Sequence, residues 1–259
     1  MKKSAHYILF LVLFLVSACS TNHQSSQEVE LTISAAASLQ DALVPIQKEF
    51  EKEYPNIKLI FNFGGSGTLQ QQISQGAPAD LFFSAAMDKF ETLINEDLIN
   101  EEDGVQLVGN EIVLVVPKDH ENRITSFEDL SNASKISVGT PESVPAGTYA
   151  KEVLENINIW ASIEGKIVFA KDVRQVLTYV ETNNVDAGIV YKTDAVSSDK
   201  VQIGATADTN THSPIIYPLG VIKDSKHREE ALKFYEYLQN EKSIKTFEEY
   251  GFKGLNETK

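Results

Sequence analysis

Apolar positions follow two alternating patterns from residue 29 onward. Short continuous apolar runs have the length of buried strands, and between them apolar residues recur every three or four positions, as on one face of a helix. The first pair is typical, because the run 31–35 is followed by an apolar face from Leu39 to Phe50 at helical spacing. Strands are expected at 31–35, 57–63, 81–84, 111–117, 135–139, 167–169, 187–191 and 215–222. Strands that alternate with helices predict an α/β fold with mostly parallel sheets.

The turn between the first strand and its helix suits an anion. Ala35 to Ala37 are small and leave room for close approach to the backbone, and Ser38 is expected at the helix N-cap, with Asp41 completing an approximate capping box. A helix that starts directly after a strand presents free backbone N–H groups and the positive end of its dipole. One such turn is common in α/β proteins and is weak evidence alone.

The same arrangement recurs later in the chain. Ser66 lies in a glycine-rich turn that opens a helix, Ala146 lies near the start of another, and Val173 opens a third. Tyr191 ends a strand and can add a phenolic hydroxyl. Because the carboxyl ends of strands line one crevice in doubly wound lobes, these positions are expected to lie together. For any one of them alone, ordinary capping or packing is the simpler explanation.

The first 18 residues have the pattern of a signal peptide. A basic start is followed by an apolar stretch from Ile8 to Val16 and the small-residue site Val16-Ser-Ala-Cys19, which resembles a bacterial lipobox. The apolar stretch is shorter than the roughly 20 residues that span a bilayer. Cys19 is the only cysteine, so an intramolecular disulfide is excluded, and Cys19 is the expected lipidation site, with 19–28 as a lipid-anchored tether. An ordinary signal peptide with an incidental cysteine is the alternative.

The chain is strongly acidic. Removal of Lys2 and Lys3 with the leader takes the formal net charge from −14 to −16. Such a chain is a poor partner for nucleic acid or for anionic lipid surfaces. Its field also repels small anions, so an anion site must rely on local dipoles and hydrogen bonds.

The sequence motifs of common enzyme classes are incomplete or absent. The stretch Gly64-Gly-Ser66-Gly-Thr68 has threonine where a hydrolase nucleophile elbow needs glycine, and a Walker loop, a dinucleotide fingerprint and a His-Glu-x-x-His zinc pattern are all absent from the sequence. The chain is therefore expected to be neither an enzyme nor a cofactor-binding protein.

Six stretches occur in the order and with the spacing of one family. They are Ala35-Ala-Ala-Ser38-Leu, Gly65-Ser66-Gly-Thr-Leu, Gly76-Ala-Pro-Ala-Asp-Leu-Phe, Val144-Pro-Ala146-Gly-Thr-Tyr-Ala, Asp172-Val173-Arg and Gly188-Ile-Val-Tyr191. From about residue 29 to 253 the chain resembles the molybdate-binding proteins of ABC importers, in the lipoprotein form of Gram-positive bacteria. The resemblance implies a two-lobed, type II periplasmic-binding-protein-like α/β fold. Each lobe would be a mostly parallel sheet flanked by helices, with the ligand in the cleft between them.

The expected lobes each take part of the chain. Lobe 1 would hold 29–112 plus 217–259, and lobe 2 would hold 113–216. Two crossing strands, near 111–117 and 215–222, would join the lobes.

The resemblance also implies the binding residues. The family binds its tetrahedral dianion with two serines, two backbone amides and a tyrosine, which correspond to Ser38, Ser66, Ala146, Val173 and Tyr191. All are neutral donors, so the metal would enter only as an oxyanion, with no direct protein ligand. Monohydrogen phosphate carries a proton that such a site leaves unpaired, at a cost of roughly 1–3 kcal/mol. Sulfate differs mainly in size, so a sulfate receptor, or an anion sensor on the same fold, is the alternative.

The implied protein is a lipid-anchored, extracytoplasmic receptor. It would capture molybdate, and also tungstate, and deliver it as a monomer to an ABC permease and its ATPase, with no cofactor and no nucleic acid. Four other residues are expected to be structural. Asp80 is interpreted as a turn or capping residue, Asp172 as a helix cap, Trp160 as a packing residue, and Arg174 as facing solvent or another carboxylate.

Overall fold

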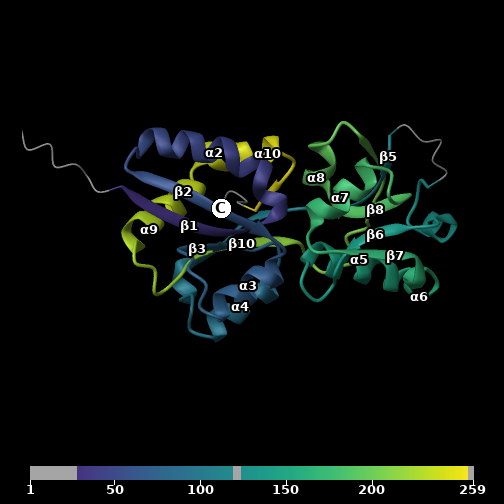
Figure 1. The fold of residues 1–259 in the computed structure, drawn as a ribbon, viewed down its shortest axis with the longest axis horizontal. Coiled ribbons are helices and arrows are strands. Elements are labelled where there is room, and N and C mark those ends of the chain that lie inside the picture. The colour runs from purple at the N-terminus through teal and green to yellow at the C-terminus, as the bar shows by residue number, and fades with distance from the viewer. Residues whose placement is uncertain (1–27, 119–123, 256–259) are drawn as a thin grey trace, which may run out of the picture.

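The computed structural model describes residues 28–118 and 124–255. The expected signal peptide, Cys19 and nearly all of the tether lie outside the described residues. Figure 1 shows two lobes side by side, one built from both ends of the described chain and the other from its middle. Within the described ranges, no helix is long and apolar enough to cross a membrane.

Lobe 1 contains a six-stranded sheet in the order β11-β4-β10-β3-β1-β2. Its strands are β1 (Val29–Ala36), β2 (Ile57–Gly64), β3 (Leu81–Phe83), β4 (Gly104–Gly109), β10 (Ile216–Val221) and β11 (Lys253–Gly254). Its helices are α2 (Gln40–Glu53), α3 (Ser66–Ser74), α4 (Met87–Asn95), α9 (Arg228–Leu238) and α10 (Glu241–Glu249), with short 3₁₀ turns at Ala37–Leu39 and Glu101–Asp103.

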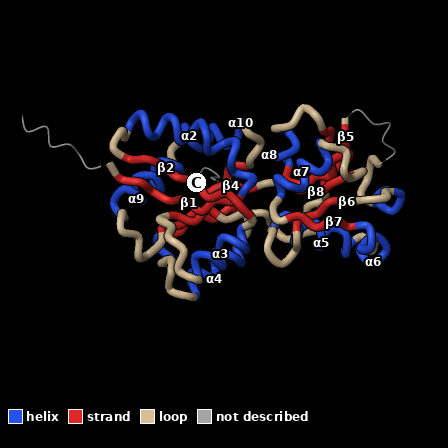
Figure 2. Tube along the Cα trace, in the orientation of Figure 1, coloured by secondary structure: helices blue, strands red, loops and turns tan. Residues whose placement is uncertain are grey.

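The two faces of this sheet bury different helices. Phe50 of α2, Phe234 of α9 and Phe247 of α10 belong to one hydrophobic cluster, whereas Leu69 of α3 and Phe90 of α4 belong to another. In Figure 2 the strands accordingly form a red layer between two groups of blue helices. The apolar face predicted from Leu39 to Phe50 is confirmed, because its members are buried in the first cluster.

Lobe 2 contains a five-stranded sheet in the order β7-β6-β8-β5-β9. Its strands are β5 (Ile112–Pro117), β6 (Ile136–Gly139), β7 (Ile167–Ala170), β8 (Ala187–Tyr191) and β9 (Val201–Thr206). Its helices are α5 (Pro145–Asn156), α6 (Trp160–Ile163), α7 (Val173–Glu181) and α8 (Lys192–Val196), with 3₁₀ turns at Glu128–Asn132 and Glu164–Lys166.

The two-lobed α/β class is confirmed, but each sheet is mixed. β1 pairs in parallel with β2 and β3, and β6 pairs in parallel with β7 and β8. β10 and β5, the first strand after each crossing between the lobes, are antiparallel to both of their neighbours. The parallel strands are the ones that lead into the site helices.

The chain crosses between the lobes in segments outside the strands. Among residues 28–118 and 124–255, β5 pairs with β8 and β9 of lobe 2 and β10 pairs with β3 and β4 of lobe 1, so each strand belongs to one sheet. The crossing segments are 110–111 and 207–215, which meet where the Asn110 N–H donates to the Ile215 carbonyl at 3.4 Å. The expectation that the strands themselves carry the crossings is therefore wrong.

Candidate functional site

The five residues expected to bind an anion line one small cavity between the lobes. They are Ser38, Ser66, Ala146, Val173 and Tyr191. The remaining lining consists of small and apolar residues, Ala36, Ala37, Gly64, Gly65, Ala85, Val144 and Pro145. The cavity volume is about 10 Å³, which is close to the space of one water molecule. An oxyanion larger than water therefore needs the lobes to separate before it can enter.

Ser38 reaches the cavity from a 3₁₀ turn, and not from a helix cap. The turn spans Ala37–Leu39, α2 begins at Gln40, and no side chain caps either element. The Ser38 Oγ lies 2.9 Å from the Tyr217 hydroxyl of β10. Asp41 is likewise engaged elsewhere, by Arg174 of lobe 2. The predicted capping box is wrong because both side chains have long-range partners.

Ser66 is the first residue of α3 and is fully buried. The Ala85 backbone N–H donates to its Oγ at 2.9 Å. Since a hydroxyl has a single proton, which this bond does not use, Ser66 can donate that proton to a group in the cavity.

The glycines beside Ser66 let the two lobes approach closely. The Gly67 N–H donates to the Ser143 carbonyl of lobe 2 at 2.9 Å. A Cβ on Gly67 would lie 2.8 Å from the Ser143 Cα, and one on Gly65 would lie 2.9 Å from the Ser143 carbonyl oxygen and 3.0 Å from that of Lys171. Both contacts are with backbone, which cannot rotate away. The absent side chains therefore make this contact between the lobes possible.

Lobe 2 presents helix N-termini to the cavity. Ala146 is the second residue of α5, after Pro145 at the first position, and Val173 is the first residue of α7. N–H groups in a first helical turn lack intrahelical acceptors and lie at the positive end of the dipole. Asp172 caps α7 as predicted, because its Oδ1 accepts the Gln175 N–H at 2.8 Å.

Close packing sets the position of α5. A Cβ on Gly147 would lie 2.0 Å from the Gly139 carbonyl oxygen at the end of β6. Only glycine allows this approach, so Gly147 holds the N-terminus of α5 against the strand and at the rim of the cavity.

Tyr191 ends β8 and is almost completely buried. Its hydroxyl has no hydrogen-bond partner within residues 28–118 and 124–255. Burial raises the pKa of this hydroxyl well above its ordinary value, so the group stays protonated and can donate. A buried donor without a partner at the wall of a cavity favours an acceptor there, because leaving it unpaired costs about 1–3 kcal/mol.

Arg174 contacts carboxylates, which is one of the two outcomes expected from the sequence, the other being exposure to solvent. Its Nη1 lies 2.7 Å from Asp41 Oδ2 across the lobe boundary, 3.1 Å from Ser197 Oγ and 3.8 Å from Asp194 Oδ1. Asp194 is fully buried, and burial raises its pKa to about 7 against the attraction of Arg174. The guanidinium group therefore links the lobes through ion pairs.

Two other structural expectations have different outcomes. Trp160 packs in the core of lobe 2, as predicted. Asp80 is more than a local turn residue, because its carboxylate accepts the Thr32 N–H at 2.7 Å and the Ser225 hydroxyl at 2.6 Å. It thereby joins β1 to the segment after β10.

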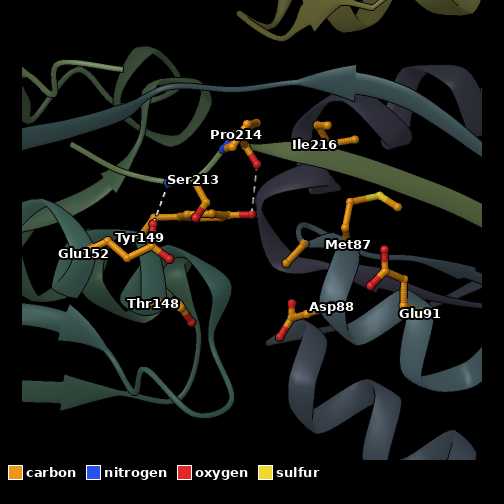
Figure 3. Close-up of a pocket in the computed structure, with 10 residues that line it drawn as sticks. Met87, Asp88, Glu91, Thr148, Tyr149, Glu152, Ser213, Pro214 and Ile216 are labelled. Atoms are coloured by element: carbon orange, nitrogen blue, oxygen red, sulfur yellow. Dashed lines mark hydrogen bonds between the residues drawn. The ribbon is translucent and has the colours of Figure 1, made fainter. Parts of the chain in front are cut away.

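A larger groove of about 470 Å³ also lies between the lobes (Figure 3). Carboxylates line it from both sides, with Asp88 and Glu91 on α4 and Glu152 on α5. Tyr149 extends across it, and its hydroxyl donates to the Pro214 carbonyl at 3.5 Å. The carboxylates repel anions, so the small neutral cavity suits an oxyanion better than this groove.

Among the described residues, no group of three or more His, Cys, Asp or Glu side chains is placed to hold a metal ion. What the small cavity offers is a set of neutral hydrogen-bond donors, drawn from both lobes, for an acceptor.

Two contacts near the site carry no signal in the sequence. Tyr217 lies 179 positions from Ser38, and Asp41 lies 133 positions from Arg174. Neither belongs to a stretch with family-like spacing, so only the folded chain reveals these contacts.

Comparisons with known proteins agree with this geometry. Residues 31–253 match the family model of the bacterial extracellular solute-binding proteins. YvgL of Bacillus subtilis, assigned as an ABC transporter substrate-binding lipoprotein, is 57% identical over 97% of this chain and 98% of its own length. The molybdate-binding protein ModA of Escherichia coli is 37% identical over 88% of this chain and 90% of its own.

A solved structure is also similar to this chain. The substrate-binding domain assigned to a molybdenum ABC transporter of Clostridium difficile is 46% identical to this chain, with a TM-score of 0.67, over 88% of this chain and all of that one. The chain therefore belongs to the bacterial extracellular solute-binding proteins and is a ModA-like substrate-binding protein that delivers its ligand to an ABC transporter.

Proposed function

We propose that the ligand is molybdate, with tungstate as a second ligand of nearly the same size. The binding groups in this proposal are the hydroxyls of Ser38, Ser66 and Tyr191 and the backbone N–H groups of Ala146 and Val173. The observation that carries it is the convergence of five neutral donors from both lobes on one small cavity, whose described lining includes no carboxylate. The ModA relative at 37% identity supports the choice of molybdate.

Lobe closure follows from this arrangement. A fully deprotonated oxyanion accepts from donors on both lobes at once, so it stabilises the closed state relative to the open one. Closure around a neutral site also explains how an acidic protein holds a dianion, since short hydrogen bonds to a charged ligand act locally.

The rest of the proposal concerns the cellular setting. Cys19 would carry the lipid after removal of residues 1–18, with 19–28 as the tether and the receptor on the extracytoplasmic face of the membrane. A monomer of two lobes would meet the permease and ATPase of an importer. The protein would bind without catalysis, and no cofactor is part of the proposal.

Titration calorimetry on the full chain, purified in detergent, tests the ligand. Molybdate and tungstate are expected to bind with similar affinity, and phosphate at least about tenfold more weakly, because its proton finds no acceptor. The affinity for sulfate shows how strongly the size of the cavity discriminates between sulfate and molybdate. Equal affinity for molybdate, sulfate and phosphate would contradict the proposal.

Substitution of Ser38 by alanine tests the site. Ser38→Ala removes one donor to a charged ligand and is expected to cost about 1.5–3 kcal/mol of binding free energy. The matched control is Ser131→Ala, because Ser131 is an exposed serine in lobe 2 whose hydroxyl donates to the Glu128 carbonyl. An unchanged molybdate affinity in Ser38→Ala would exclude this residue from the site.

A further inference from the structure

A chain of buried hydrogen bonds lies behind Ser38. The Ser38 Oγ is 2.9 Å from the Tyr217 hydroxyl, and Asn110 Nδ2 donates to that hydroxyl at 3.1 Å. Asn110 Nδ2 also donates to Thr193 Oγ1 of lobe 2 at 3.0 Å. The four residues are at most 7% exposed, so water has little access to replace a missing partner.

The direction of this chain is set at Asn110. The Glu111 backbone N–H donates to Asn110 Oδ1 at 2.9 Å. Because a backbone N–H can only donate, the amide oxygen must face it, and the amide nitrogen must face Tyr217 and Thr193. Both hydrogens of the amide nitrogen then have acceptors.

Tyr217 transmits the hydrogen-bond direction set at Asn110 to Ser38. Because the Tyr217 oxygen accepts from Asn110, its single proton is available for donation to the Ser38 Oγ, 2.9 Å away. Burial raises the pKa of Tyr217 well above its ordinary value, so this proton is retained. The Ser38 Oγ accepts from Tyr217, and its own proton is left for a group in the cavity that it lines.

We propose that Asn110 and Tyr217 are positioning residues that orient the Ser38 hydroxyl, so that it donates to a bound oxyanion and does not accept from it. The inference rests on the proposed function, because it requires the anion to bind at Ser38. A freely rotating serine could accept the proton of monohydrogen phosphate, whereas a proton donated by Tyr217 occupies one lone pair of the Ser38 Oγ and favours donation to the ligand. Two residues that do not touch the ligand thus contribute to its selection.

The place of the relay in the fold strengthens the argument. Asn110 lies in the first crossing between the lobes, and Tyr217 follows the second crossing directly. The Tyr217 ring also packs against Tyr191, with centroids 5.7 Å apart. The relay therefore joins a hydroxyl of lobe 1 to both crossings and to lobe 2.

The first test is Tyr217→Phe, which keeps the ring and removes the proton donated to Ser38. The measurement is the ratio of molybdate to phosphate association constants, by calorimetry on the full chain in detergent at about pH 8, where phosphate is mainly the monohydrogen dianion. The ratio is expected to fall about tenfold, because Ser38 can then accept the phosphate proton.

The second variant, Asn110→Asp, replaces the donor to Tyr217 by an acceptor. The direction of the relay would reverse, so the ratio is expected to fall further than in Tyr217→Phe. Both ligands are dianions, so the added charge weakens both and largely cancels in the ratio. The control is Tyr235→Phe, which removes a hydroxyl on α9 and is expected to keep the wild-type ratio.

A purely structural role for Tyr217 is distinguished by a double variant. In a Ser38→Ala background, Tyr217→Phe is expected to leave the ratio unchanged, because the oriented hydroxyl is already gone. A further fall in that background would overturn the relay. Wild-type protein that does not bind molybdate would overturn the proposed function, and the relay with it. Tight molybdate binding with a wild-type ratio in Tyr217→Phe would overturn the relay alone.

Discussion

The two lobes supply donors of different kinds to the same cavity. Lobe 1 offers the hydroxyls of Ser38 and Ser66, and each of these oxygens has an internal partner, Tyr217 in one case and the Ala85 N–H in the other. Lobe 2 offers the first turns of α5 and α7, where the backbone itself donates, together with one hydroxyl, that of Tyr191. Donors in lobe 1 therefore depend on particular side chains, whereas those in lobe 2 depend mainly on where two helices begin.

This difference indicates which residues can change the specificity for the bound anion. A hydroxyl can donate or accept, and its direction depends on its neighbours, whereas a backbone N–H can only donate. Substitutions in lobe 1 can thus alter which anion is preferred, and those in lobe 2 mostly alter how tightly any anion binds.

The largest effect on molybdate affinity is expected where the lobes touch. Gly67→Ala would place a Cβ 2.8 Å from the Ser143 Cα, so the closed state would be opposed by backbone contact. A cost of about 2–3 kcal/mol on closure lowers molybdate affinity about 100-fold, because affinity scales with the population of the closed state. Titration calorimetry measures the affinity, and thermal unfolding is expected to stay near that of the wild type.

Gly165→Ala is the matched control for that variant. A Cβ on Gly165 meets nothing within 4 Å, so its affinity is expected to stay unchanged. Wild-type affinity in Gly67→Ala would show that the lobes bind ligand without this contact.

The backbone donor of lobe 2 can be removed by proline. Val173 is the first residue of α7, a position where proline is tolerated because its missing N–H has no intrahelical acceptor. Val173→Pro is expected to lose one hydrogen bond to a charged ligand, about 1.5–3 kcal/mol by calorimetry, for molybdate and sulfate alike.

Val173→Ala controls for the lost side chain, since it keeps the N–H. The two variants together separate the donor from the packing of a residue that is 4% exposed. Equal affinities in the proline and alanine variants would remove Val173 from the site and weaken the contrast between the lobes.

Apolar periodicity was enough to predict most of the fold. Among the strands next to the site, β8 is a continuous apolar run, and β1 and β2 place apolar residues at alternate positions, and periodicity finds both patterns. β4 and β9 escape it, because the first half of β4 is exposed or half-buried and β9 is an edge strand whose side chains are mostly exposed or half-buried. The crossings could not be placed either, since a short irregular segment has no period.

The site could be predicted only in part, for the same physical reason. Turns that open helices and the ends of strands are local in sequence, so all five candidate positions stand out, and the resemblance adds their roles and the ligand. The partners that orient these groups come from distant strands. Ser38 looks like a helix cap until Tyr217 is seen beside it, and Gly67 looks like a turn residue until Ser143 is seen against it.

A carboxyl group behind the lobe 2 donors gives a pH dependence that the neutral relay behind Ser38 does not. Burial raises the pKa of Asp194 to about 7 from an unfolded value of 3.8. Between these values the folded protein holds a proton that the unfolded chain has released, so the free energy of unfolding falls as pH rises from about 4 to 7 and then levels. The pKa of about 7 already includes the attraction of Arg174, so the shift from 3.8 corresponds to a fall of about 4 kcal/mol in the free energy of unfolding.

Denaturant unfolding across this pH range measures the effect, with Asp194→Asn as the comparison. The asparagine does not ionise, so the fall between about pH 4 and 7 is expected to shrink by the same amount. An unchanged pH profile in Asp194→Asn would mean that Asp194 ionises in the folded protein as easily as in the unfolded chain.

The smallest effect on molybdate affinity is expected from breaking the ion pair that joins the lobes. Asp41 and Arg174 lie 2.7 Å apart, but both side chains are about one-third exposed, at 33% and 32%. Solvent screening limits such a pair to about 0.5–1 kcal/mol, so Asp41→Asn is expected to weaken molybdate binding about threefold, and less at high salt. Glu49→Gln breaks an exposed pair with Lys242 inside lobe 1 and is expected to leave affinity unchanged. If both variants lowered affinity equally, the cause would be the overall charge of lobe 1, and the pair between the lobes would have no separate part in closure.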